Sequence, residues 1–161
     1  MTLCTVNGLY YVSLKRIEGV TSNPLYDITE KRRDKMELIL TVDVKVDDAY
    51  GVEGVTRNVY MIDFHGTASG PYFNGEVIGS GVDTQKQSKD GVTRLSARYM
   101  LEGTDMENQK CHVFIENNSN DEGGFTPIIV TDSKALAKWE TTNLSAQIEP
   151  QDGGVIVKIY A

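Results

Sequence analysis

The sequence predicts an all-β protein, built as a closed antiparallel β-barrel of about eight or more strands. Three observations predict this class. Apolar and polar residues alternate along short segments, turn dipeptides separate these segments at short intervals, and only one segment has the composition of a helix. Because alternate residues of a strand face opposite sides of a sheet, each segment supplies one apolar and one polar face.

The first 35 residues are predicted as an N-terminal extension, with a strand or hairpin within residues 3–17 followed by a charged linker. Residues 36–161 form the predicted barrel domain, and its first strand covers residues 36–46. Four apolar members of this strand alternate with Thr, Asp and Lys: Leu40, Val42, Val44 and Val46. Residues 47–54 are predicted as a loop.

The rest of the barrel domain is predicted as short strands joined by turns. Asp90-Gly91 is a dipeptide typical of a two-residue hairpin loop. Asp132 is the expected N-cap of the one short helix, over residues 133–139. The further strands are expected at residues 57–64, 72–78, 82–87, 93–102, 110–117, 128–131, 142–148 and 155–160.

Composition and charge exclude several classes of function. The net charge of −7 and the pI of about 4.8 argue against a nucleic-acid partner, because phosphate binding requires clustered Lys and Arg. The one basic cluster, residues 31–33, lies among acidic residues and is interpreted as a solvated segment. No apolar run approaches the roughly 18 residues of a membrane span, and the start of the sequence does not have the pattern of a secretion signal. We therefore expect no membrane partner and a cytoplasmic location.

The cysteines and histidines do not predict a metal site. Cys4 and Cys111 are far apart in the sequence and are expected to be small buried hydrophobic residues. His65 and His112 are the only histidines, whereas a zinc ion usually takes three or four protein ligands at short spacings. The prediction is a protein without a metal or another cofactor.

Residues 66–78, followed by Gly81-Val82-Asp83, resemble the bacterial and fungal family catalogued as domain of unknown function 3237. Further matching pieces follow in order: Asp90-Gly91, Ala97-Arg98-Tyr99, Thr104-Asp105, Phe114-Ile115-Glu116-Asn117, Thr126-Pro127 and Trp139. The sequence departs from the family pattern at Val82, Thr84-Gln85 and Met106. The resemblance covers about residues 36–161 and implies a calycin-like, lipocalin-like closed barrel. It implies no particular reaction, since the family has no agreed activity.

Ionisable residues recur in phase along the predicted strands. On the strand over residues 93–102, Arg98 lies opposite an apolar face formed by Leu95, Ala97, Tyr99 and Leu101. If the polar faces point to water, these residues are ordinary surface. If they point into the barrel, a buried Arg98 requires a partner, and Asp83 or Glu76 is the natural one. We favour the inward orientation, because all three lie in segments that resemble the family.

The first functional hypothesis is a small-molecule-binding barrel with a polar site at its mouth or in its lumen. Asp83 and Arg98 would orient the ligand, with Glu76, Tyr99 and Glu116 as further contacts. The expected aromatic walls of the site are Tyr72, Phe73, Tyr99 and Phe114.

Two alternatives remain open. The first is a metal-independent acid–base isomerase or lyase acting on a small polar metabolite. Glu76 or Asp83 would be the base, His65 or His112 a proton relay, and Arg98 an anion clamp. The second is a structural or protein-interaction module, in which a salt bridge fixes the barrel register.

The composition of the N-terminal extension predicts that it packs against another surface, because it has more apolar residues than a free tail normally exposes. We expect it to pack on the barrel exterior or to pair with a second subunit in a homodimer. Deleting residues 2–30 should therefore lower stability or change the mass in solution, measured by thermal unfolding and light scattering. A truncated protein with unchanged stability and oligomeric state would show that the extension is a dispensable tail.

Overall fold

The computed structural model describes residues 2–6, 9–13 and 36–161, and the chain divides into two compact units, Met1–Glu37 and Leu38–Ala161. In the smaller unit, β1 (Thr2–Val6) and β2 (Leu9–Ser13) form an antiparallel hairpin. This confirms a hairpin near the start of the sequence. The expected charged linker, and the packing expected of the extension, lie outside the described residues.

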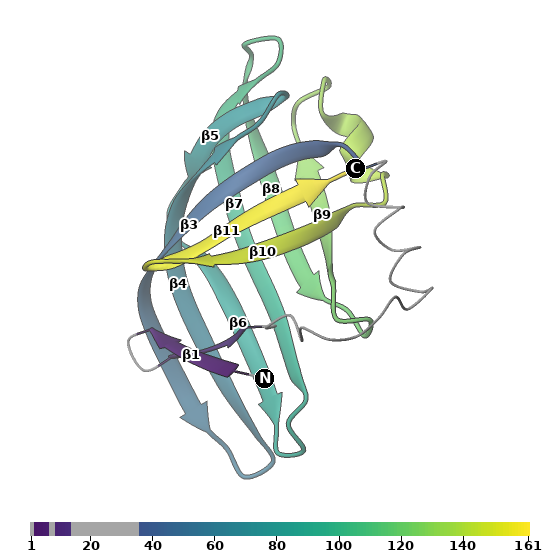
Figure 1. Ribbon diagram of the computed structural model, residues 1–161. Coiled ribbons are helices and arrows are strands. Elements are labelled where there is room, and N and C mark those ends of the chain that lie inside the picture. The colour runs from purple at the N-terminus through teal and green to yellow at the C-terminus, as the bar shows by residue number, and fades with distance from the viewer. Residues whose placement is uncertain (1, 7–8, 14–35) are drawn as a thin grey trace. The chain divides into compact units, whose positions relative to one another are not determined.

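The larger unit contains nine strands and one short 3-10 helix (Figure 1). All nine strands expected within residues 36–161 are present, and most are longer than predicted. In chain order the elements are β3 (Leu38–Glu53), β4 (Arg57–Ser69), β5 (Phe73–Val77), β6 (Gly81–Ser88), β7 (Thr93–Asp105), β8 (Lys110–Ser119), β9 (Phe125–Thr131), η1 (Ala137–Glu140), β10 (Ser145–Gln151) and β11 (Gly154–Tyr160).

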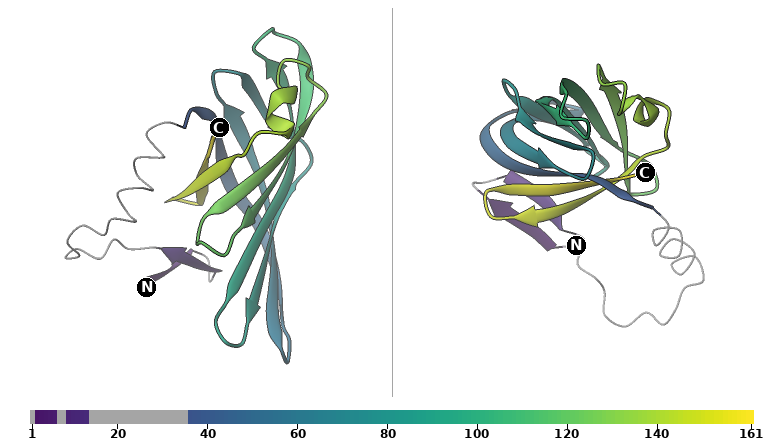
Figure 2. Two further views of the ribbon diagram at one scale, coloured as in Figure 1. Left: turned by 90° about the vertical axis from the view of Figure 1, so that its right-hand side faces the viewer. Right: turned by 90° about the horizontal axis from the view of Figure 1, so that it is seen from above.

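The strands of the larger unit pair antiparallel in a ring-like order. The sheet runs β3-β11-β10-β9-β8-β7-β5-β4-β6, and additional pairings join β3 to β4 and β7 to β6. β3 is the first strand of this order and β4 is the last but one, so their pairing gives the sheet its ring-like closure. β9 and β10 share a single register pair, Phe125 with Ala146. Figure 2 shows the strands of this unit curving round.

The expected loop over residues 47–54 is wrong, because β3 continues to Glu53 and pairs with β4 along this length. The register shifts between Val46 and Ala49, as at a β-bulge. A bulge inserts residues into one strand and interrupts its alternation. The pair Asp47-Asp48 at this point therefore looks like the start of a loop in the sequence. In the structure the strand pairing continues beyond it.

The expected short helix is present near the C-terminal part, but it is a 3-10 helix over Ala137–Glu140 and does not cover residues 133–139. The segment forms a turn followed by η1, whose N-cap residue, Leu136, makes no side-chain capping hydrogen bond. The Asp132 carboxylate instead accepts a hydrogen bond from the backbone N–H of His112, at 2.7 Å. In the described part of the chain, no helix has the length and apolar composition that crossing a bilayer requires.

Buried apolar side chains line one face of the sheet, which we call the inner face. They form one continuous core that also takes in η1 and the residues before it. The largest fully buried side chains are Trp139, Phe73, Ile39, Leu40, Leu101, Ile115, Ile129, Leu136, Ile159, Val42 and Val113. Cys111 is likewise buried, as expected, and burial raises the pKa of its thiol.

Asp105 ties the turn between β7 and β8 to the segment before η1. Its carboxylate accepts hydrogen bonds from the backbone N–H groups of Glu107 (2.9 Å) and Gln109 (3.0 Å) and from the Ser133 hydroxyl (2.7 Å). These bonds, the one from Ser133 foremost, hold the pKa of Asp105 below its ordinary value. This anchor keeps Trp139 over the core, and we therefore assign Asp105 a structural role.

Two glycines allow β5 and β7 to approach closely. Gly75 lies opposite Gly103 in the register, and the Phe73 ring lies over the pair. A Cβ on Gly103 would lie 2.1 Å from the backbone oxygen of Asn74 and 2.7 Å from the Phe73 ring. Because the nearest atom belongs to the backbone, a side chain can be accommodated only by moving a strand.

Substituting Gly103→Ala should therefore destabilise the protein by about 1–3 kcal/mol, through overpacking against β5. The matched control is Gly124→Ala, whose added Cβ would lie 3.4 Å from the Asn120 side chain, an ordinary contact. We expect the control to change stability by less than about 0.5 kcal/mol. Guanidinium unfolding of both variants measures the difference, and equal midpoints would contradict the close approach of the strands.

Candidate functional site

Four polar side chains interrupt the apolar inner face where β6, β7 and β8 run side by side. Asp83 on β6 and Asn117 on β8 both lie opposite Ala97 on β7. Directly paired residues share one face of a sheet, so both side chains belong to the inner face. Tyr99 lies two positions along β7 from Ala97, and Gln85 lies two positions along β6 from Asp83. We call Asp83, Gln85, Tyr99 and Asn117 the inner polar cluster.

Tyr99 joins this cluster to the core. Its side chain is 4% exposed and packs edge-to-face on Phe64, with 5.5 Å between ring centroids. Gly81 makes room for that ring, because a Cβ there would lie 2.2 Å from it. Burial raises the pKa of the Tyr99 phenol far above its ordinary value. Among the described residues its hydroxyl has no hydrogen-bond partner.

Asn117 presents a second buried polar atom without a partner. The residue is 3% exposed, and its Oδ1 accepts no hydrogen bond from any residue that the structure describes. A buried polar group left unsatisfied costs about 1–3 kcal/mol, and folded proteins contain few of them. Two such atoms on adjacent strands therefore mark this part of the inner face as a candidate site.

Asp83 is the carboxylic acid of the cluster. Gln85 Nε2 donates a hydrogen bond to its Oδ2 at 2.8 Å. Burial raises the pKa of Asp83, and the hydrogen bonds from Gln85 and from the backbone of Ser96 offset only part of this effect. No Lys or Arg lies on the inner face of β6, β7 or β8. The carboxyl group is therefore partly desolvated, and no cation on these strands stabilises its charged form.

The expected pairing of Arg98 with Asp83 or Glu76 is wrong. Arg98 lies opposite Val82, which places it on the outer face, and its Nε donates to Glu116 Oε2 at 3.0 Å. Hydrogen bonds from the Asn118 amide and from the Arg98 guanidinium lower the pKa of Glu116. Glu76 is exposed on the outer face as well.

Both histidines also lie on the outer face, away from the cluster. His65 Nδ1 lies 2.6 Å from Asp47 Oδ1. His112 lies between Asp132, at 2.9 Å from Nδ1, and Glu102, at 3.4 Å from Nε2. These carboxylates, Asp132 foremost, raise the pKa of His112. Among the described side chains, no group of three or more His, Cys, Asp or Glu is placed to hold a metal ion.

Of the four expected aromatic walls, only Tyr99 belongs to the inner polar cluster. Phe73 is buried over the paired glycines, and Tyr72 packs edge-to-face on Trp139. Phe114 lies opposite the exposed Met100 on the outer face. The aromatic residues therefore do not converge on one site.

Sequence reasoning missed Asn117 and gave Gln85 no role. One pattern could have identified Asn117: it continues the odd-numbered alternation of Cys111, Val113 and Ile115, which are all buried. A polar residue in phase with an apolar face is a candidate interior group.

Comparison with solved structures supports the fold. The chain resembles a protein of unknown function from Clostridium acetobutylicum, at 20% identity and a TM-score of 0.64, over 78% of this chain and 97% of that one. It also resembles an enzyme from Penicillium herquei, at 15% identity and a TM-score of 0.61, over 78% and 93% of the two chains. A beta-barrel like protein from Acinetobacter baumannii matches at 15% identity and a TM-score of 0.62, over 78% and 94%.

Comparison of sequences gives the family. A UPF0311 protein from Clostridium acetobutylicum is 32% identical over 95 residues, which span 57% of this chain and 58% of the relative. Residues 34–121, which include all of β3 through β8, match the profile of the family described as protein of unknown function DUF3237. The chain therefore belongs to the DUF3237 family.

Proposed function

We propose that the protein binds a small molecule at the inner polar cluster, inside a calycin-like closed barrel. The observation that carries this proposal is the pair of buried polar atoms, Tyr99 Oη and Asn117 Oδ1, without hydrogen-bond partners among the described residues. Ala97 lies between Asp83 and Asn117 in the register, so its small side chain is the one that separates the polar groups on either side.

The chemistry of the cluster favours a neutral ligand with both apolar and hydrogen-bonding parts. The Tyr99 hydroxyl can donate a hydrogen bond, Asn117 Oδ1 can accept one, and the Asp83 carboxyl group accepts when ionised. Phe64 and the other core residues beside Tyr99 suit an apolar ring or chain. An anionic ligand is disfavoured, because it would meet a carboxyl group and no cation on this face.

A second candidate function is acid–base catalysis at the same cluster. The raised pKa of Asp83 supports it, since a partly buried carboxyl group with no cationic partner holds a proton more readily than a solvated one and can return it to a substrate. One structurally similar protein is described as an enzyme. In this proposal Asp83 is the acid–base group and Tyr99 a hydrogen-bond donor. The outer-face histidines and Arg98 take no part.

The test is a thermal-shift screen of the full chain with small neutral hydroxylated aromatic compounds, followed by Ala97→Phe. At about 100 times its Kd, a ligand stabilises the folded state by about 2.7 kcal/mol, a readily measured rise in Tm. Ala97→Phe places a bulky ring between Asp83 and Asn117 and should abolish the rise for every compound that binds there. Glu76→Gln, on the outer face, is the control and should leave the rise unchanged.

Compounds that stabilise Ala97→Phe as strongly as the wild type would contradict the proposed site. A screen without any stabilising compound, together with ordered water at Tyr99 and Asn117 in a crystal structure, would assign the cluster to buried water. Mass spectrometry of the bound compounds after incubation distinguishes the two candidate functions, binding and catalysis. Conversion that is lost in Asp83→Asn supports catalysis, and binding without conversion supports a binding protein.

A further inference from the structure

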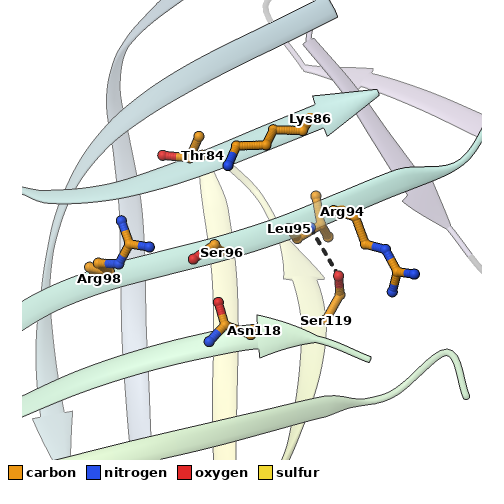
Figure 3. Close-up of a pocket in the computed structure, with 8 residues that line it drawn as sticks. All are labelled: Thr84, Lys86, Arg94, Leu95, Ser96, Arg98, Asn118 and Ser119. Carbon is orange, nitrogen blue, oxygen red and sulfur yellow. Dashed lines mark hydrogen bonds between the residues drawn. The ribbon is translucent and has the colours of Figure 1, made fainter. Parts of the chain in front are cut away.

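A hollow of about 260 Å³ lies on the outer face of β6, β7 and β8, on the other side of the sheet from the inner polar cluster (Figure 3). None of the residues that line it is acidic, although the chain as a whole has a net charge of −7. The lining residues are Thr84, Lys86, Arg94, Leu95, Ser96, Arg98, Asn118 and Ser119.

The strand register arranges this hollow as a polar row with cations on both sides. The central row crosses three strands and carries two hydroxyls and an amide: Thr84, Ser96 and Asn118. Lys86 and Arg94 lie opposite each other on one side of the row, and Arg98 lies on the other side. In Figure 3 the Lys86 side chain runs back toward Thr84, whereas the Arg94 guanidinium points away from the row.

The direct pairing of Lys86 with Arg94 is unfavourable by itself. Like charges that lie opposite each other on adjacent strands destabilise a sheet. Arg94 contacts the Asp121 carboxylate, and Arg98 contacts Glu116. Among the described residues, no carboxylate pairs with Lys86. Three cations and two carboxylates therefore leave one positive charge at the hollow without a counter-charge.

Ser96, in the middle of the central row, has an unsatisfied polar atom. Its Oγ is shielded from solvent and has no hydrogen-bond partner among the described residues. This hydroxyl can donate to an oxygen of a bound anion once the side chains that shield it move aside. The missing counter-charge and the missing acceptor thus lie at the same place, and one oxyanion would supply both.

We propose that this hollow binds the phosphate group of a small phosphorylated molecule. A phosphate ester carries about −1.5 to −2 charges and three strong acceptor oxygens, which suit Lys86, Arg98 and the Ser96 hydroxyl. The remaining volume accommodates the organic part of the molecule. This site lies on the opposite face from the proposed small-molecule site and takes an anionic ligand instead of a neutral one, so the two proposals are independent.

The test is a titration of the full chain with inorganic phosphate and with glycerol 3-phosphate at constant ionic strength. The chemical shifts of the backbone amides, measured by NMR, report the binding. We expect saturable shifts at Ser96 and Asn118. Lys86→Gln should weaken the binding of either phosphate about tenfold, the loss of one charge-assisted contact. Lys134→Gln removes the same charge from an exposed residue elsewhere and should leave the affinity unchanged.

Two further measurements distinguish a binding role from a structural one. Lys86→Gln should raise Tm in the absence of phosphate, because it removes the repulsion from Arg94, while it weakens phosphate binding. Ser96→Ala should weaken phosphate binding severalfold, and Ala97→Phe, on the inner face, should not affect it. Shifts that do not saturate, or equal losses of affinity in Lys86→Gln and Lys134→Gln, would overturn the proposal.

Discussion

The register between β6 and β7 decides on which side of the sheet each functional residue lies. In this register Asp83 pairs with Ala97, and Val82 pairs with Arg98. A shift by one residue would exchange the two faces of β6 and bring Asp83 beside Arg98 on the outer face. The observed register separates them, so that the carboxyl group faces the core while the guanidinium pairs with Glu116 on the outside.

The sequence predicted much of the fold, because most strands alternate clearly. The apolar face of β7, from Leu95 to Leu101, was predicted correctly, and its buried residues confirm the direction of the alternation. β6 has no such alternation: residues 82–85 are all half-buried, and the apolar Val82 lies on the outer face while Asp83 lies on the inner one. Its orientation comes from its two neighbours in the sheet, which sequence periodicity does not show. The same limit applies at the bulge of β3, where the neighbouring β4 keeps the strand extended.

The candidate site was predicted only in part for the same reason. Asp83 and Tyr99 were identified from their own strands, and both belong to the inner polar cluster. The expected partners, Arg98 and Glu76, were grouped with them on the assumption that all polar faces point the same way. Because the register places one polar face inside and the other outside, a single expected site becomes two candidate sites. The inner one is a carboxyl group without a cation, and the outer one is a set of cations around an unsatisfied hydroxyl.

The most direct test of the separation of Asp83 from Arg98 is a pH titration of Asp83, monitored by carbon NMR of its side-chain carboxyl group. Burial without a cationic partner predicts a pKa above the ordinary value of 3.8. Glu116, bonded to Asn118 and Arg98, should titrate below its ordinary value of 4.5 in the same experiment. A pKa of Asp83 at or below 3.8 would mean that the group is solvated or paired with a cation, and would contradict its place on the inner face.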